Sequence, residues 1–69
     1  MDWEKIVGAN LKRLRKERGL SQEALAGEAG LAMRHLGRIE RGEGNPTVAV
    51  LGKLANVLSI HPTEFYREN

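Results

Sequence analysis

The stretch from Gln22 to Arg41, QEALAGEAGLAMRHLGRIER, contains two short helical patterns separated by one glycine. The first pattern repeats small and apolar residues at helical spacing, and the second has Leu36 and Ile39 three positions apart. Between them, Gly30 can adopt the positive φ that ends a helix at little cost. Ala26 is small enough to let two helix backbones approach where they cross. Residues 22–41 are therefore predicted to form a helix-turn-helix.

The second helix of this motif is predicted to expose a positively charged stripe. Its outward positions follow the i, i+3, i+4, i+7 rule and are Arg34, Gly37, Arg38 and Arg41. An arginine fork can donate two hydrogen bonds to guanine in the major groove, which makes Arg34 and Arg38 candidates for base contact. Met33 could contact a thymine methyl, or it could be a partly exposed structural methionine. The alternative for the whole stripe is a solvated charged face.

The same helix, expected over about residues 32–40, is weak by itself. Ala32 occupies the N-cap position, where its lack of a capping oxygen should cost about 1 kcal/mol. Gly37 in the middle should cost about another 0.5–1 kcal/mol relative to alanine. Gly37 either allows DNA to approach the helix backbone closely, which would make it part of the base-contact set, or marks a position where no side chain is needed. Packing against the rest of the domain must hold this helix.

Six segments occur in a fixed order along the chain: LRKERGLSQEALA, AG, IERG, NP, LGKLANVL and SIHPTEFY. Together they resemble the lambda-repressor-like, Cro-type (xenobiotic-response-element) family of helix-turn-helix regulators. The resemblance covers Asn10 to Tyr66. Within the family, the chain is similar to small restriction–modification controller proteins and compact phage repressors. It implies an all-α domain of five helices that binds double-stranded DNA as a sequence-specific transcriptional regulator.

The resemblance also assigns roles to individual residues. Gln22, at the start of a helix with free N–H groups, would contact a DNA phosphate, although an ordinary polar residue is the alternative. Arg41 and Asn45 resemble further phosphate contacts, at the end of the second helix of the motif and in the loop after it. Arg15 and Glu40 would form a structural ion pair that ties the first helix to the third.

The remaining segments complete a five-helix pattern. A first helix over residues 2–18 would have a core face made of apolar residues at helical spacing: Trp3, Val7, Leu11 and Leu14. Ser21 and Thr47 are good N-caps for the second and fourth helices. Ser59 follows the fourth helix where the family usually has glycine, so the turn there should be strained. Pro62 suits the first position of a short fifth helix.

Two aromatic residues, Phe65 and Tyr66, lie near the end of the chain. Aromatic side chains at such a position should either fold back on the core or pack against a partner. Stand-alone members of the family commonly dimerise through this end. Phe65 and Tyr66 are therefore predicted to lie in a homodimer interface.

Composition limits the remaining possibilities. A length of 69 residues allows one domain, residues 1–69, and the absence of cysteine leaves no disulfide or thiolate zinc site. No stretch of about 20 apolar residues could span a membrane, so a cytoplasmic protein is expected. The net charge is only +2, but residues 1–18 carry six basic and three acidic groups. No cofactor and no metal are expected.

The expected function is therefore sequence-specific regulation of transcription by a homodimer on DNA, with RNA polymerase as a further candidate partner. The sequence leaves open whether the protein represses or activates. An antitoxin or adaptor that uses the same fold mainly to bind a protein is the alternative. An enzyme is disfavoured because the two histidines lie 26 positions apart and no nucleophile has an activating base at useful spacing.

Overall fold

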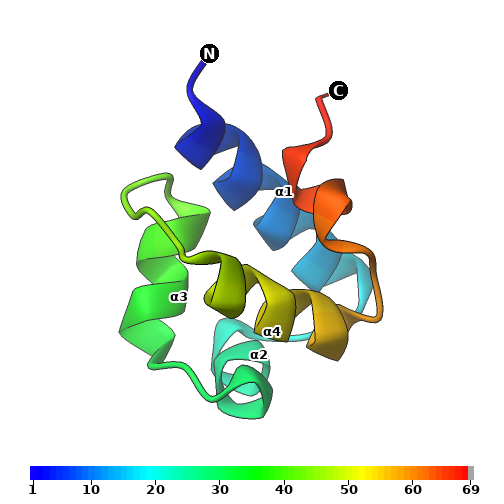
Figure 1. Ribbon diagram of the computed structural model, residues 1–69. Coiled ribbons are helices and arrows are strands. Elements are labelled where there is room, and N and C mark those ends of the chain that lie inside the picture. Colours follow the sequence, from blue (N-terminus) through cyan, green and yellow to red (C-terminus); the bar gives the residue numbers. More distant parts are fainter. Residues whose placement is uncertain (69) are drawn as a thin grey trace.

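The computed structural model describes residues 1–68, which contain four α-helices, one short 3₁₀ helix and no strand. The elements are α1 (Trp3–Glu17), α2 (Gln22–Ala29), α3 (Met33–Glu40), α4 (Val48–Leu58) and η1 (Pro62–Tyr66) (Figure 1). The all-α prediction is confirmed, with four α-helices, and the short fifth helix expected at Pro62 is a 3₁₀ helix. No helix within residues 1–68 combines the length and the apolar character needed to cross a membrane.

Three of the four α-helices begin with a capping side chain. Asp2, Ser21 and Thr47 each accept a hydrogen bond from the backbone N–H three residues later, at 3.0–3.1 Å. These bonds satisfy donors that the first turn of a helix leaves without a partner. Ala32, at the start of α3, makes no side-chain cap bond. The start of the helix that carries the arginine stripe is therefore the weakest of the four.

Left-handed residues end two of the helices. Gly30 ends α2 with φ +71°, a conformation that glycine adopts without steric cost. Ser59 ends α4 with φ +56°, and among the described residues no other non-glycine residue has a positive φ. The expected strain after α4 is present, since a Cβ disfavours this conformation.

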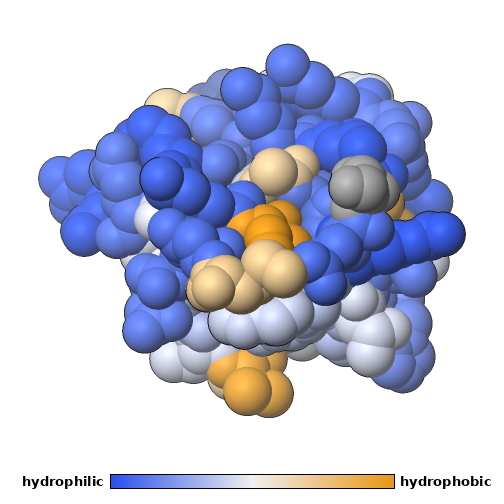
Figure 2. Space-filling view, turned by 90° about the horizontal axis from the view of Figure 1, so that it is seen from above, coloured by the Kyte–Doolittle hydropathy of each residue, from blue (hydrophilic) through white to orange (hydrophobic). Residues whose placement is uncertain are grey.

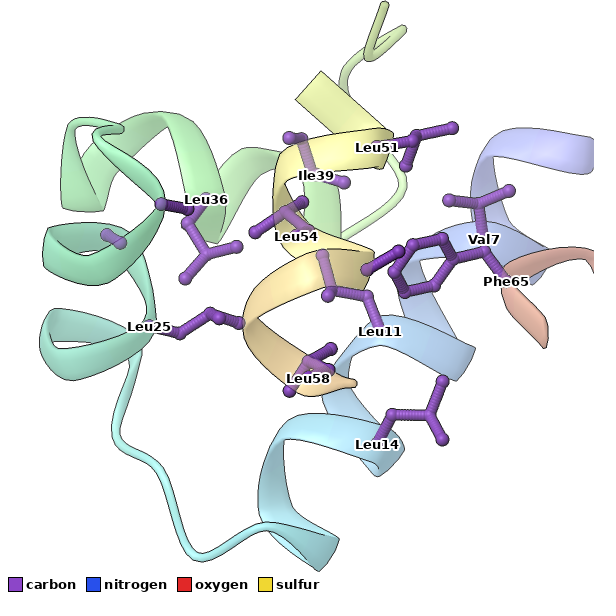
Figure 3. Close-up of a cluster of buried hydrophobic side chains, with 13 residues drawn as sticks. Val7, Leu11, Leu14, Leu25, Leu36, Ile39, Leu51, Leu54, Leu58 and Phe65 are labelled. Atoms are coloured by element: carbon purple, nitrogen blue, oxygen red, sulfur yellow. The ribbon is translucent and has the colours of Figure 1, made fainter. Parts of the chain in front are cut away.

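The core contains apolar side chains from all five elements (Figure 3). Phe65 from η1 lies near Leu11 of α1 and has no exposed surface, as is also true of Leu54 and Leu58 of α4. The prediction that Phe65 lies in a dimer interface is therefore wrong, because its ring closes the core of its own chain. Trp3 was expected on the core face of α1, but it lies in the first turn, beyond the core, and is 47% exposed.

The N-terminal half of α1 packs closely against the end of α3. A Cβ on Gly8 would overlap the carbonyl oxygen of Ile39 and would lie 2.8 Å from that of Glu40. Only glycine lets the two backbones approach this closely. This contact sets the position of α3 relative to α1.

Asn10 fastens the C-terminal segment to α1. Its Nδ2 donates hydrogen bonds to the carbonyl oxygens of Phe65, at 2.8 Å, and Arg67, at 2.7 Å. Asn10 is itself buried, and its bond to Phe65 is buried while its bond to Arg67 is partly buried. The two ends of the chain consequently lie on the same side of the molecule, opposite α2 (Figure 1).

Candidate nucleic-acid interface

The outer face of α3 carries exposed, positively charged side chains. Arg34, Arg38 and Arg41 are exposed, and Met33 in the first turn is 53% exposed. The inner face contributes Leu36 and Ile39, both almost fully buried. The helix is therefore held by its apolar face while its arginines remain available to a partner.

Gly37 does not belong to the exposed part of this stripe. It is buried, and the groups nearest to the position of a Cβ are Nη1 of Arg41, at 3.2 Å, and the side-chain amide of Gln22, at 3.8–3.9 Å. The prediction of an outward-facing Gly37 is wrong because two neighbouring polar side chains lie over it. A direct base contact by Gly37 is therefore not available in this arrangement.

Arg15 and Glu40 form an ion pair inside the molecule. Nε and Nη2 of Arg15 donate to the two carboxylate oxygens of Glu40, at 2.7 and 3.1 Å. Nη1 of Arg15 also donates to the carbonyl oxygen of Leu20, at 2.8 Å. Both charged side chains are nearly buried, at 9% and 2% exposure. The pair joins α1, the turn before α2 and the end of α3.

Gln22 belongs to the same polar network. Its Nε2 donates to Oε1 of Glu40 at 2.9 Å, and the residue is half-buried. The amide nitrogen of Gln22 therefore points inward, toward Glu40, and the contact of Gln22 with a DNA phosphate stays a prediction. The network ties the first residue of α2 to the last residue of α3.

Arg41 is paired with Glu43 on the surface. Its Nε and Nη2 donate to the two carboxylate oxygens, at 3.1 and 3.2 Å, and both side chains are more than half exposed. The hydrogen bonds from Arg41, followed by the positive charges of Arg41 and Arg38, lower the pKa of Glu43. An exposed pair of this kind contributes little to stability, and in this structure it directs the Arg41 side chain toward Glu43.

The loop after α3 passes over the start of α1. Asn45 in this loop is exposed, and with Pro46 it lines a small cavity of about 50 Å³ beside Trp3 and Tyr66.

The rings of Trp3 and Tyr66 lie 6.0 Å apart with a tilt of 60°. Tyr66 remains 46% exposed. The exposed aromatic surface is therefore made by Trp3 and Tyr66 rather than by Phe65.

The face that carries both termini shows a small apolar spot surrounded by hydrophilic side chains (Figure 2). A second cavity, of about 230 Å³, opens among residues from α1 and the C-terminal segment: Ile6, Ala9, Asn10, Arg67 and Glu68. In the part of the chain that the structure describes, no group of three or more metal-binding side chains comes together. Neither cavity therefore contains the side chains of a metal centre.

Asn10 and Gly8 were not singled out from the sequence. The signal for Asn10 was its place on the core face of α1, three residues after Val7 and beside Leu11. A polar residue at such a position must find buried partners. Gly8 offered no comparable signal, because a glycine within a helical pattern does not show what packs against it.

A model of the helix-turn-helix family matches residues 11–65, which include α2, α3, α4, the C-terminal part of α1 and η1 as far as Phe65. The chain belongs to the helix-turn-helix family. This helix-turn-helix protein is 44% identical over 64 residues to the uncharacterised HTH-type transcriptional regulator y4dJ of Sinorhizobium fredii, with 93% of this chain and 83% of the relative covered. It is 39% identical over 56 residues to SinR of Bacillus subtilis and spans half of that regulator's length.

Solved structures give the same result. The restriction–modification controller protein C.AhdI of Aeromonas hydrophila superimposes with a TM-score of 0.89 at 40% identity, over 91% of this chain and 96% of the controller. The family expected from the sequence motifs is confirmed. The helix-turn-helix chain is a DNA-binding transcriptional regulator of the lambda-repressor-like fold.

Proposed function

We propose that this regulator binds a two-part operator as a homodimer, with α3 of each copy in the major groove. The observation that carries the proposal is the exposed pair Arg34 and Arg38 on a helix fixed from behind by the buried Arg15–Glu40 pair. A rigidly held helix with outward arginines suits base readout, because the helix backbone that carries the arginines is already in place before DNA binds. Two such helices would read half-sites about 34 Å apart.

Within this proposal the residues divide into two kinds of contact. Arg34 and Arg38 read bases, and Met33 offers apolar surface to a thymine methyl. Arg41, Asn45 and the side chain of Gln22 contact phosphates, which fix the register of α3 on the duplex. The proposal assigns no catalytic step and no cofactor to the chain. It places the protein in the cytoplasm, with access to RNA polymerase at the promoter it occupies.

The homodimer is proposed to form through the exposed aromatic surface of Trp3 and Tyr66. These two side chains lie together and remain about half exposed, which is unusual for a surface without a partner. Phe65 supports this surface from the core and does not take part directly. Tyr66→Ala should therefore weaken association, measured by sedimentation equilibrium. An unchanged monomer–dimer equilibrium would place the interface elsewhere.

The operator is tested by selection from random duplex DNA, followed by titration of the enriched and a scrambled site at two salt concentrations. Arg38→Ala should cost about 1–3 kcal/mol of binding free energy and relax the preference at one base position. Lys53→Ala removes one positive charge from α4 and serves as the control. If Arg38→Ala instead weakens binding equally on every DNA sequence, Arg38 contacts a phosphate and not a base.

A protein partner is the second candidate. The exposed aromatic surface of Trp3 and Tyr66 would then bind another chain, as an antitoxin or adaptor does. If no DNA sequence is enriched and the affinity for all DNA falls as the salt concentration rises, α3 binds DNA only through non-specific electrostatic attraction. That result would reject operator recognition and favour the protein partner.

A further inference from the structure

Gly37 is buried, and the three atoms nearest to the position of a Cβ on it are all polar. Gly37 lies between Arg34 and Arg38 in the outward stripe of α3, yet it is buried under the polar ends of Arg41 and Gln22. Its neighbour Arg38, on the same face, is exposed. The missing side chain of Gly37 therefore leaves a space that two polar side chains share.

The geometry of an α-helix explains why Arg41 reaches this space. Side chains of a helix tilt toward its N-terminus, so residue 41 extends back over residue 37, one turn earlier. Nη1 of Arg41 lies 3.2 Å from the position of a Cβ on Gly37, while Nε and Nη2 are bonded to Glu43. The guanidinium is thus held between Glu43 on one edge and Gly37 on the other.

Gln22 forms the third side of the space. Its amide lies 3.8–3.9 Å from the same Cβ position, and its Nε2 is held by Glu40, which is in turn held by Arg15. Its Oε1 is an amide carbonyl oxygen, which can only accept a hydrogen bond. Gln22 therefore lies between the guanidinium of Arg41 and the buried Arg15–Glu40 ion pair.

We propose that Gly37 is a positioning residue, which by its missing side chain holds Arg41 against α3 in the direction needed for contact with DNA. The inference rests on the proposed function and deepens it, because it replaces a base contact by Gly37 with an action through Arg41. An arginine that is already ordered loses less side-chain entropy when a phosphate binds. Glycine at this position weakens the helix but keeps Arg41 in place.

The test is a double-mutant cycle with Gly37→Ala and Arg41→Ala, measured on the enriched operator. Arg41→Ala should reduce affinity about tenfold, the loss expected for one charged phosphate contact. Gly37→Ala should reduce affinity about threefold to tenfold in the native background, and should have almost no effect when Arg41 is already alanine. Gly37→Ala should fold, because the only close contact of the added methyl is with the end of the Arg41 side chain, and the Gln22 amide lies at ordinary van der Waals distance.

Gly27→Ala is the matched control. Gly27 is also helical, and a Cβ there would meet nothing within 4 Å. Both alanines should raise the melting temperature through helix propensity, but only Gly37→Ala should weaken DNA binding. An equal loss from Gly37→Ala with and without Arg41 would mean that DNA approaches the α3 backbone directly, which overturns the proposal. An unchanged affinity would overturn it too.

A readout without DNA separates this inference from the proposed function. In the free protein, NMR titration of the Glu43 carboxyl follows the Arg41–Glu43 contact, because Arg41 lowers the pKa of that carboxyl. Gly37→Ala should displace the guanidinium of Arg41, weaken its hydrogen bonds to Glu43 and so shift the pKa of Glu43 upward, toward its ordinary value, and Gly27→Ala should not. If the native protein selects no operator, the proposed function fails. If the titration of Glu43 is the same in all three proteins, Gly37 does not hold Arg41 and the inference fails.

Discussion

At the scale of single residues, the close approach of α1 and α3 depends on Gly8. Gly8→Ala should lower the free energy of unfolding by about 1–3 kcal/mol, because the new methyl would overlap backbone carbonyl groups that cannot move aside. Urea denaturation followed by circular dichroism measures the change. Gly27→Ala is the control and should instead gain up to about 1 kcal/mol. Equal gains in both variants would show that α1 and α3 are farther apart than described.

Residues also show where sequence patterns stop being informative. Trp3 lies at the right spacing for the core face of α1, but helical spacing does not tell how far along the helix the core extends. The burial of Phe65 depends on how the chain turns after Ser59, and Gly37 is covered by side chains from α2 and α3. Each of these three errors concerns a neighbour that is distant in sequence or a long flexible side chain.

At the scale of elements, the missing cap of α3 can be restored. Ala32 already has the extended conformation of an N-cap residue, with φ −68° and ψ 138°. Ala32→Ser should therefore stabilise the protein by about 1 kcal/mol, because a hydroxyl can accept a hydrogen bond from the first turn. Thermal or urea denaturation measures the gain. Ala49→Ser, inside the first turn of α4, should give no such gain, and a similar gain there would argue against capping.

The buried ion pair joins three elements and is expected to be costly to break. Glu40→Ala leaves the Arg15 guanidinium and the Gln22 amide without their partner, and should lower the unfolding free energy by about 3–5 kcal/mol. Equilibrium denaturation measures the loss. Glu17→Ala breaks the exposed pair with Arg13 and should cost no more than about 0.5 kcal/mol. Similar losses in the two variants would mean that water reaches the Arg15–Glu40 pair.

At the scale of the whole molecule, the C-terminal segment is held by the packing of Phe65 and by hydrogen bonds from one side chain of α1, Asn10. Asn10→Leu leaves the carbonyl oxygens of Phe65 and Arg67 without their donor and should cost about 1–3 kcal/mol. Amide hydrogen exchange in η1 should become faster than in α2. Asn56→Leu, at an exposed position of α4, is the control. Unchanged exchange in η1 would show that packing of Phe65 alone holds the segment.

The overall architecture followed from the sequence because its signals are local. Ser21, Gly30 and Thr47 each act within one turn of their own position, so the helix boundaries could be placed without knowing the fold. The arginines of α3 were also placed correctly on the surface, because helical spacing decides which side faces out. The contacts of these arginines could not be predicted in the same way. The pair of Arg41 with Glu43, for example, is seen only in the folded structure.

The placement of the chain ends has a practical consequence for anyone who labels this protein. Both ends lie on the side away from α2, and the exposed rings of Trp3 and Tyr66 are only a few residues from them (Figure 1). A bulky tag at either end would crowd the surface proposed for self-association before it reached the start of α3. Fluorophores for binding assays are therefore better attached through engineered cysteines on exposed positions of α4, such as Lys53 or Asn56.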